Sequence, residues 1–352
     1  MLKKRLNLRN VVAIVACLTV TTMFSGCDNK NVLDEDEPRT FGNYFNPANC
    51  TWMSQLSDDI SLANLSIPGT HDSGTEKLSA GRMNTQNFSI ERQLNDGIRF
   101  LDIRLRNKGN NLQVYHGNRN CDVSFDEVLN WCKAFLTAYP GEVILMSIKN
   151  EENDDILMNI WRYFEDANWK GLFYTGMASL CEDSMPALGD VRGKIVVFKR
   201  FPYAGAIPSF VNWYSKWDDA NVGSSTFNFK ILNKSDYTCY VEDEFQEYDT
   251  HKKRTAVENH LTAANTGNKK DFYMTYVSIA GHYSPAQASD HTPYQYAWGG
   301  NGVNPVMNTS VINFLSENSG LKRWGVIMLD FYNKHGAYGE NDLVELIINS
   351  NF

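Results

Sequence analysis

The sequence contains no two cysteines spaced as Cys-x-x-Cys, so it lacks the usual ligand pattern of a structural zinc site. The sequence also has fewer basic than acidic side chains. The 41 acidic and 33 basic side chains give a formal net charge of −8, which disfavours binding to nucleic acid or through a strongly cationic surface. No apolar run is long enough to span a bilayer, and no repeat or low-complexity linker divides the chain after its N-terminal segment. These absences predict one domain.

The first 27 residues have the pattern of a secretory signal peptide. A short apolar run, Val11 to Val20, follows a positively charged start made of Lys3, Lys4, Arg5 and Arg9. The segment ends in Phe-Ser-Gly-Cys, which resembles a bacterial lipobox, so Cys27 is expected to be lipidated as the first residue of the mature protein. An ordinary signal peptide with an incidental cysteine is the alternative. Residues 28–50, which begin polar and acidic, are expected to form a flexible tether.

Residues 51–352 have the length of a single large α/β domain, and a hydrophobic content of 43% supports a sizeable core. An odd number of cysteines lies beyond Cys27, so an exported form permits at most two disulfides and leaves one thiol over. The sequence leaves their pairing open. These cysteines are Cys50, Cys121, Cys132, Cys181 and Cys239.

Short apolar runs alternate with helical patterns along this domain. The predicted strands are Leu62–Ile67, Phe100–Leu105, Leu112–Tyr115, Val143–Ile148, Ile195–Lys199, Tyr237–Val241, Phe272–Ile279 and Gly325–Leu329. The predicted helices are Phe125–Ala138, which follows a capping box at Ser124, then Asp154–Asn168, Val306–Ser316 and Asp342–Ile348. Continuously apolar strands indicate a parallel sheet covered by helices, but only a tight turn fits between Leu105 and Leu112. The predicted fold class is therefore α/β, a distorted TIM-type barrel that need not be closed.

Chemically capable side chains fall at or beside the ends of these strands, where a barrel of this type carries its active site. They are His71, Arg104, His116, Lys149, Arg200, Asp243 and Asp330. A histidine at such a strand end can act as a general base, although an arbitrary His-Asp pair is more often a surface pair in a turn. If Lys149, Arg200 and Asp243 are considered without the other motifs, they are also consistent with solvated charges near strand ends. Asp330 is likewise consistent with a buried acid that accepts hydrogen bonds from backbone N–H groups.

Three segments together carry a family resemblance. They are Ile67-Pro-Gly-Thr-His-Asp-Ser-Gly-Thr75, Asp96-Gly-Ile-Arg-Phe-Leu-Asp-Ile-Arg104 and Val114-Tyr-His-Gly117. The chain resembles the bacterial phosphatidylinositol-specific phospholipases C from about Asn64 to Asn351. The downstream matches, Glu142–Lys149, Gly193–Arg200 and Gly325–Phe331, occur in the same order.

The resemblance implies a lyase-type phospholipase C that releases diacylglycerol and inositol 1,2-cyclic phosphate. It implies that His71, oriented by Asp330, is the general base and that His116, paired with Asp72, is the general acid. Arg104 would contact the phosphate, with Asp102 steering it. Lys149, Arg200, Asp243 and Phe245 would hold the inositol ring.

The chain departs from this family at the ring and at the membrane. Phe245 stands where a tyrosine is common, so the apolar face is kept and the hydroxyl is lost. The segment Lys77–Gln86 has no tryptophan, and the late loop Ser284–Asn304 offers only Tyr294, Tyr296 and Trp298 for insertion into a membrane. Weak interfacial binding is therefore expected, with a lipid anchor at Cys27 partly replacing it.

Metal independence is expected, because Arg104 occupies the phosphate side where calcium-dependent relatives hold their ion with acidic ligands. No cofactor is expected. Two alternatives remain open: a metal-dependent glycerophosphodiesterase-like or sphingomyelinase-D-like barrel, and a non-catalytic lipoprotein that binds inositol lipids. The expected partners are phosphatidylinositol or a GPI-type lipid and a membrane surface, with the protein a monomer on the bacterial cell envelope.

Overall fold

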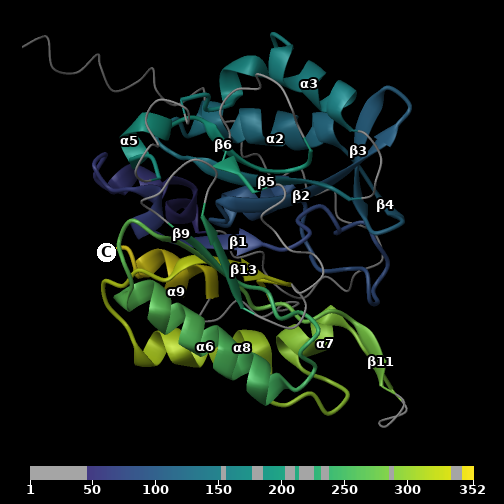
Figure 1. The fold of residues 1–352 in the computed structure, drawn as a ribbon, viewed down its shortest axis with the longest axis vertical. Helices are drawn as coiled ribbons and strands as arrows, with labels where there is room; N and C mark the ends of the chain where they lie inside the picture. Colours follow the sequence, from purple (N-terminus) through teal and green to yellow (C-terminus); the bar gives the residue numbers. More distant parts are fainter. Residues whose placement is uncertain are drawn as a thin grey trace, which may run out of the picture. The chain divides into compact units, whose positions relative to one another are not determined.

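The computed structural model describes residues 46–151, 156–176, 185–202, 211–213, 226–230, 238–284, 289–333 and 343–352. They form a central β-sheet with helices around it (Figure 1). The predicted signal peptide, its Cys27 and Cys181 lie outside the described residues. No described helix is both long and apolar enough to cross a membrane.

The central sheet has the strand order β7-β6-β5-β2-β1-β13-β10-β9-β8. Its strands are β1 (Ser66–Thr70), β2 (Phe100–Lys108), β5 (Ile144–Asn150), β6 (Ile195–Arg200), β7 (Val211–Asn212), β8 (Phe227–Lys230), β9 (Thr238–Glu242), β10 (Phe272–Tyr276) and β13 (Gly325–Leu329). Every neighbouring pair from β7 to β9 is parallel, and β8 pairs antiparallel with β9. Within the described chain β7 and β8 are the two edges, so the sheet is an open, distorted barrel, and the predicted fold class is confirmed.

Two further strands extend this sheet as a hairpin. Strands β3 (Asn111–His116) and β4 (Arg119–Ser124) pair antiparallel, and β3 also pairs antiparallel with β2. This confirms the tight turn between Leu105 and Leu112. A separate two-stranded sheet is made of β11 (His282–Ser284) and β12 (Ser289–His291). The patterns did not predict β4, β7, β8, β11 or β12, because most are too short to show a period.

The first strand begins later than predicted. Leu62–Asn64 is a 3-10 turn, since the Ser61 hydroxyl caps it by accepting from the backbone N–H of Ala63 at 3.3 Å. Strand β1 instead runs through Pro68 and Gly69. Gly69 passes so close to its neighbours that an added Cβ would lie 2.6 Å from the Met328 sulfur and 2.9 Å from Cβ of Phe100. A residue with a side chain would therefore push β1 away from β13 and β2.

Helices cover the outside of the barrel. They are α1 (Ile90–Asn95), α2 (Phe125–Ala138), α3 (Leu157–Glu165), α5 (Leu188–Val191), α6 (Thr250–Thr266), α7 (Pro293–Trp298), α8 (Met307–Glu317) and α9 (Leu343–Asn349). Helices α2, α8 and α9 lie within one residue of their predicted bounds, and the capping box at Ser124 is present. Helix α3 is shorter than predicted. Helix α6 was missed, because its buried face includes Lys253 and His260 and so shows little apolar periodicity. In Figure 1, α2 and α3 lie beside β5 and β6, and α6, α8 and α9 lie on the opposite side of the molecule.

The packed chain begins before the predicted boundary at residue 51. Pro47–Thr51 is a 3-10 helix in which Asn49 and Cys50 are buried. The fully buried Arg99 donates to the carbonyls of both residues at 3.0 Å and is paired with Glu142 at 2.8 Å. Because a buried guanidinium needs acceptors for its N–H groups, residues 46–50 belong to the fold and not to the tether.

The described cysteines form no disulfide. Cys50, Cys121, Cys132 and Cys239 are all buried, and no two of them are bonded to each other. The sequence had left their pairing open.

Register places the functional residues in a row. Arg104 on β2 lies opposite Lys149 on β5, which lies opposite Arg200 on β6. Thr70 pairs with Leu329, so the residues that follow them, His71 and Asp330, leave β1 and β13 side by side. Parallel strands present their carboxyl ends at one rim, and the sequence-predicted site residues gather there.

Candidate active site

His71 lies between two carboxylates. Its Nδ1 is 2.8 Å from Oδ1 of Asp330, and its Nε2 is 3.1 Å from Oδ2 of Asp72. The backbone holds both: the N–H of His71 donates to the carbonyl of Leu329 at 3.0 Å, and Asp72 adopts a left-handed φ of 44° that turns its side chain back toward the ring. Burial alone would lower the pKa of His71, but Asp72 and then Asp330 outweigh it and raise that pKa to about 10.

His116 faces the same carboxylate from the end of β3. Its Nε2 lies 3.4 Å from Oδ2 of Asp72, and its Nδ1 lies 2.8 Å from the backbone carbonyl of Met83. A carbonyl can only accept, so Nδ1 carries a proton and Nε2 is the nitrogen that can gain or lose one. The predicted His116–Asp72 pair is therefore formed. The sequence did not show that one oxygen of Asp72 is shared by both imidazoles.

Arg104 joins the two buried carboxylates behind the histidines. Its Nε is 2.8 Å from Oδ1 of Asp72, and its terminal nitrogen is 3.0 Å from Oδ2 of Asp102. Burial would raise the pKa of Asp102, but the Arg104 guanidinium and then Arg200 hold it below its usual range. Burial would also raise the pKa of Asp72, but Arg104 and then His116 lower it. Both acids are therefore ionised, and both contact Arg104, which lines the cavity.

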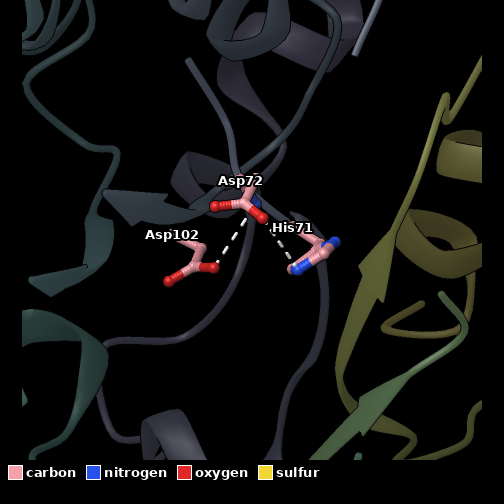
Figure 2. A group of neighbouring side chains, drawn as sticks. All are labelled: His71, Asp72 and Asp102. Carbon is pink, nitrogen blue, oxygen red and sulfur yellow. Dashed lines mark hydrogen bonds and ion pairs between the residues drawn. The ribbon is translucent and has the colours of Figure 1, made fainter. Parts of the chain in front are cut away.

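His71, Asp72 and Asp102 are the described side chains that come closest to a metal-ligand set, with one candidate ligand atom each within 4.8 Å of one another. Figure 2 shows Asp72 between the other two, and its backbone N–H donates to Asp102 at 3.3 Å. A divalent ion held by both acids would lie against the guanidinium of Arg104, which already contacts both. Charge repulsion therefore opposes a metal at this position.

These groups open onto a cavity of about 660 Å³. Every predicted substrate-binding residue lines it, together with four of the predicted catalytic residues: His71, Arg104, His116, Lys149, Arg200, Asp243, Phe245 and Asp330. Asp72 and Asp102 are buried just behind this lining. Burial raises the pKa of Asp243 to about 6, with Lys253 and His71 opposing the rise.

Glu151 was missed by sequence reasoning. One of its oxygens accepts from the backbone N–H of Gly117 at 2.7 Å, and the other lies 3.2 Å from Nζ of Lys149. Glu151 thereby fixes the turn after His116 and the ammonium of Lys149 at once. Its spacing was the available signal, since a residue two positions after Lys149 on a strand points to the same face.

Tyr276 was also missed. Its ring meets the imidazole of His71 edge-on, with centroids 5.8 Å apart and planes at 82°. Alternation along β10 would have placed it inside the barrel with Phe272 and Met274. This edge-on contact helps to hold the His71 imidazole in place.

The rim aromatics differ from expectation. Pro293–Trp298 forms α7 and not an open loop. Tyr296 is buried, with its hydroxyl 3.1 Å from His282, and the indole N–H of Trp298 donates to the carbonyl of Phe331 at 2.6 Å. The Tyr296 ring is thus used for packing, whereas the Trp298 ring is half-buried and is tied to the fold through its N–H.

Comparison with known proteins identifies the family. Residues 66–201 match the model of the phosphatidylinositol-specific phospholipase C X domain. A 1-phosphatidylinositol phosphodiesterase of Staphylococcus aureus is 32% identical over 319 residues, covering 85% of this chain and 93% of that protein. A protein of the same name from Listeria monocytogenes is 30% identical, covering 80% and 81%.

Solved structures give the same answer. A Staphylococcus aureus phosphatidylinositol-specific phospholipase C superposes with a TM-score of 0.72 at 30% identity, covering 87% of this chain and 98% of that one. The Listeria monocytogenes enzyme superposes with a TM-score of 0.64 at 26% identity, covering 86% and 99%. The fold and site define an α/β-barrel phosphodiester-cleaving enzyme. The chain belongs to the bacterial phosphatidylinositol-specific phospholipase C family.

Proposed function

We propose that the protein cleaves phosphatidylinositol, or a GPI-type inositol phospholipid, to diacylglycerol and inositol 1,2-cyclic phosphate. The single observation that carries this is the pair of imidazoles that share one oxygen of Asp72, at 3.1 and 3.4 Å, beside an arginine held by two acids. A base, an acid and a phosphate-binding cation are the groups that this reaction needs.

His71 is the base in this proposal. Its Nδ1 is fixed by Asp330, so Nε2 is the nitrogen that meets the inositol 2-hydroxyl. In the free site Nε2 faces Asp72 and the imidazole is protonated at neutral pH, because its pKa is about 10. A hydroxyl that displaces this contact removes one carboxylate from the ring. The pKa of His71 then falls, its Nε2 proton passes to solvent, and the neutral imidazole can accept the hydroxyl proton at Nε2.

His116 is the acid. The 2-hydroxyl oxygen attacks phosphorus, the bond from phosphorus to the glycerol oxygen breaks, and Nε2 of His116 gives that oxygen a proton. Asp72 stabilises the imidazolium before transfer, and Met83 holds the ring through Nδ1. Arg104 meets the charge that develops on the phosphate oxygens, for which a guanidinium fork is well suited.

The alternatives receive less support from the geometry. A metal-dependent barrel needs room for an ion, and Arg104 contacts both acids that would hold it. A non-catalytic binding protein needs no base and acid on opposite sides of one carboxylate. We therefore propose a metal-independent lyase that uses no cofactor.

Incubating the purified protein with phosphatidylinositol in EDTA and following products by phosphorus NMR tests this function. A cyclic inositol phosphate signal is expected. Release of acyclic inositol phosphate only after a divalent metal is added would support the glycerophosphodiesterase-like reaction.

We further propose that the enzyme is a monomer anchored to the cell envelope through an acylated Cys27. The support is the sequence alone, because Cys27 lies outside the described residues. Metabolic labelling with a clickable fatty acid should mark the wild type and not Cys27→Ser. An unlabelled wild-type protein free in the medium would mean ordinary secretion. The described barrel contains all the proposed catalytic side chains, so protein lacking residues 1–27 should keep full turnover on dispersed substrate.

A further inference from the structure

The carboxyl ends of β1 and β13 are joined by a segment that comes from neither strand. Its residues Asn84, Thr85 and Gln86 are all buried, and the Gln86 side chain is fully enclosed. The Gln86 Nε2 donates to the carbonyl of His71 and to the carbonyl of Leu329, at 2.8 Å in each case. One side chain thus bridges the two chains at the proposed base and at the residue before its orienting acid.

The parallel ladder between β1 and β13 stops at this point. The backbone N–H of His71 donates to the carbonyl of Leu329 at 3.0 Å. The next bond of a regular parallel pair would run from the N–H of Phe331 to the carbonyl of His71. The Phe331 N–H donates to the carbonyl of Thr85 at 2.7 Å instead. The His71 carbonyl accepts from Gln86 and from the Thr85 hydroxyl, the latter at 3.1 Å. Thr85 and Gln86 therefore replace one hydrogen bond of the ladder.

Both chains turn sharply beyond this point. Asp72, the residue after His71, and Phe331, the residue after Asp330, each have a left-handed backbone with φ of 44°. This conformation is unfavourable for residues other than glycine and persists where surrounding contacts hold it. Just before the two turns, Nδ1 of His71 lies 2.8 Å from Oδ1 of Asp330. The Gln86 amide binds each chain on the strand side of its turn, where it can hold these two side chains at that distance.

The orientation of the Gln86 amide follows from its partners. Both partners are carbonyl oxygens, which only accept, so the nitrogen of the amide faces them. The Oε1 atom at the other side of the amide is buried and has no hydrogen-bond partner among the described residues. Burying such an acceptor costs free energy that an apolar side chain would avoid. The two donated bonds are therefore what the amide contributes at this position.

The same segment also holds the second imidazole. The backbone carbonyl of Met83 accepts from Nδ1 of His116 at 2.8 Å. The Asn84 side chain donates to the carbonyl of Thr75 at 2.8 Å, and the hydroxyls of Thr75 and Thr85 lie 2.7 Å apart. These contacts fix the segment to the loop that follows the proposed base, so it is a firm support for the amide of the next residue.

We infer that Gln86 is a positioning residue for the general base: its amide holds the carbonyls of His71 and Leu329 together and so fixes the contact between His71 and Asp330. The inference rests on the proposed function, in which His71 is the base. The residues proposed to hold the inositol ring lie on or beside β5, β6 and β9. The amide should therefore act on turnover and not on substrate binding.

The test compares Gln86→Met with Asn351→Leu. Methionine keeps the length of the glutamine side chain and removes both N–H donors. Asn351 is the matched control, because its amide also donates to a carbonyl of β1, that of Ser66 at 2.9 Å, but at the opposite end of the strand. Asp330→Asn and the double variant of Gln86→Met with Asp330→Asn complete a double-mutant cycle. Gln86→Asn, whose side chain is too short to bridge both carbonyls, is the milder second variant.

Each variant is assayed on phosphatidylinositol, and its histidine N–H protons are recorded by NMR with isotope-labelled histidine. The Nδ1 proton of His71 should resonate far downfield in the wild type, because it bonds to a carboxylate, and is assigned by its loss in His71→Asn. Gln86→Met should move this signal upfield and lower kcat roughly 10- to 100-fold with KM unchanged, the scale of a small misplacement of a reacting group. Asn351→Leu should change neither. In the Asp330→Asn background, Gln86→Met should have little further effect on kcat.

An equal loss of kcat from Gln86→Met in the wild-type and Asp330→Asn backgrounds would overturn the inference, because the amide would then act independently of Asp330. An unmoved Nδ1 signal, or a rise in KM alone, would overturn it too. If neither Gln86 variant folds while Asn351→Leu does, the amide is part of the scaffold and the inference is wrong. Failure of the wild type to cleave phosphatidylinositol would instead overturn the proposed function, and the Nδ1 signal would still show whether Gln86 holds the contact.

Discussion

His71 and His260 are both largely enclosed, and both form their first hydrogen bond through Nδ1, yet they carry opposite charge states. His71 meets Asp330 and Asp72, and its pKa rises to about 10. His260 meets the hydroxyl of Thr275, and burial and then Lys253 lower its pKa to about 3. Burial pushes both values down, so the partners decide the outcome. A carboxylate converts a buried histidine into a proton-handling group, whereas a hydroxyl leaves it a neutral polar atom.

The same contrast holds for the two faces of the sheet. Inside the barrel, charges are concentrated and paired through shared atoms, as with Arg104 between Asp72 and Asp102. On the outer face, under α6, the buried side chains of Lys253 and Glu242 form an ion pair with each other at 2.7 Å. The inner face can therefore change its charge when a substrate enters, and the outer face holds its geometry.

The largest expected effect comes from removing the charged histidines of the inner face. His71→Ala and His116→Ala should each lower turnover by about two to four orders of magnitude, the scale of one lost general base or acid. A substrate with a good leaving group should partly restore His116→Ala, because its leaving oxygen needs no proton, and should not restore His71→Ala. Equal restoration of both variants in a chromogenic assay would contradict the assignment of base and acid.

A smaller loss is expected when the cation between the acids is reversed. Arg104→Asp should lower activity in EDTA by roughly two to three orders of magnitude, as for a lost donor to a developing oxyanion. It also places a third carboxylate beside Asp72 and Asp102, so added calcium should restore part of the activity. Rates are measured with and without the ion. A wild type that is inactive in EDTA and recovers with calcium would disprove metal independence.

The third prediction concerns Asp330, the carboxylate that contacts Nδ1 of His71. Asp330→Asn should lower the pKa of His71, since an acid in contact raises it by roughly one to three pH units. The base is active only when deprotonated, so the acidic limb of kcat/KM should move to lower pH. Glu244→Gln, which removes the same charge at a position that does not line the catalytic cavity, should leave the limb in place. An unmoved limb in Asp330→Asn would mean that this carboxylate does not set the charge of His71.

The sequence predicted much of this arrangement, because the motifs around His71, Arg104 and His116 are long and the apolar strands are continuous. The register then follows, since parallel strands of similar length bring their ends to one rim. Glu151 and the sharing of Asp72 depend on side-chain reach across strands, which a single chain does not display. Helix α6 was hidden for a related reason: Lys253 and His260 are buried through partners, Glu242 and Thr275, that lie elsewhere in the sequence.

The smallest expected effect is on stability, where the two histidines should act with opposite sign. Between the unfolded pKa of 6.5 and the folded value of about 10, native His71 holds more protons than the unfolded chain, so its stabilising contribution is full below pH 6.5 and is lost as pH rises toward 10. Between 6.5 and about 3 the unfolded chain holds the extra proton at His260, so that residue costs stability as pH falls.

Each slope is at most about 1.4 kcal/mol per pH unit. Urea unfolding of the wild type, His71→Asn and His260→Asn, each measured across pH, resolves the two contributions. His71→Asn should flatten the alkaline side of the stability profile, and His260→Asn should flatten the acidic side. Asparagine keeps a hydrogen-bonding group near the position of Nδ1, so a simple loss of packing would shift the whole profile without changing its shape. Parallel profiles for all three proteins would show that partner chemistry does not separate these histidines.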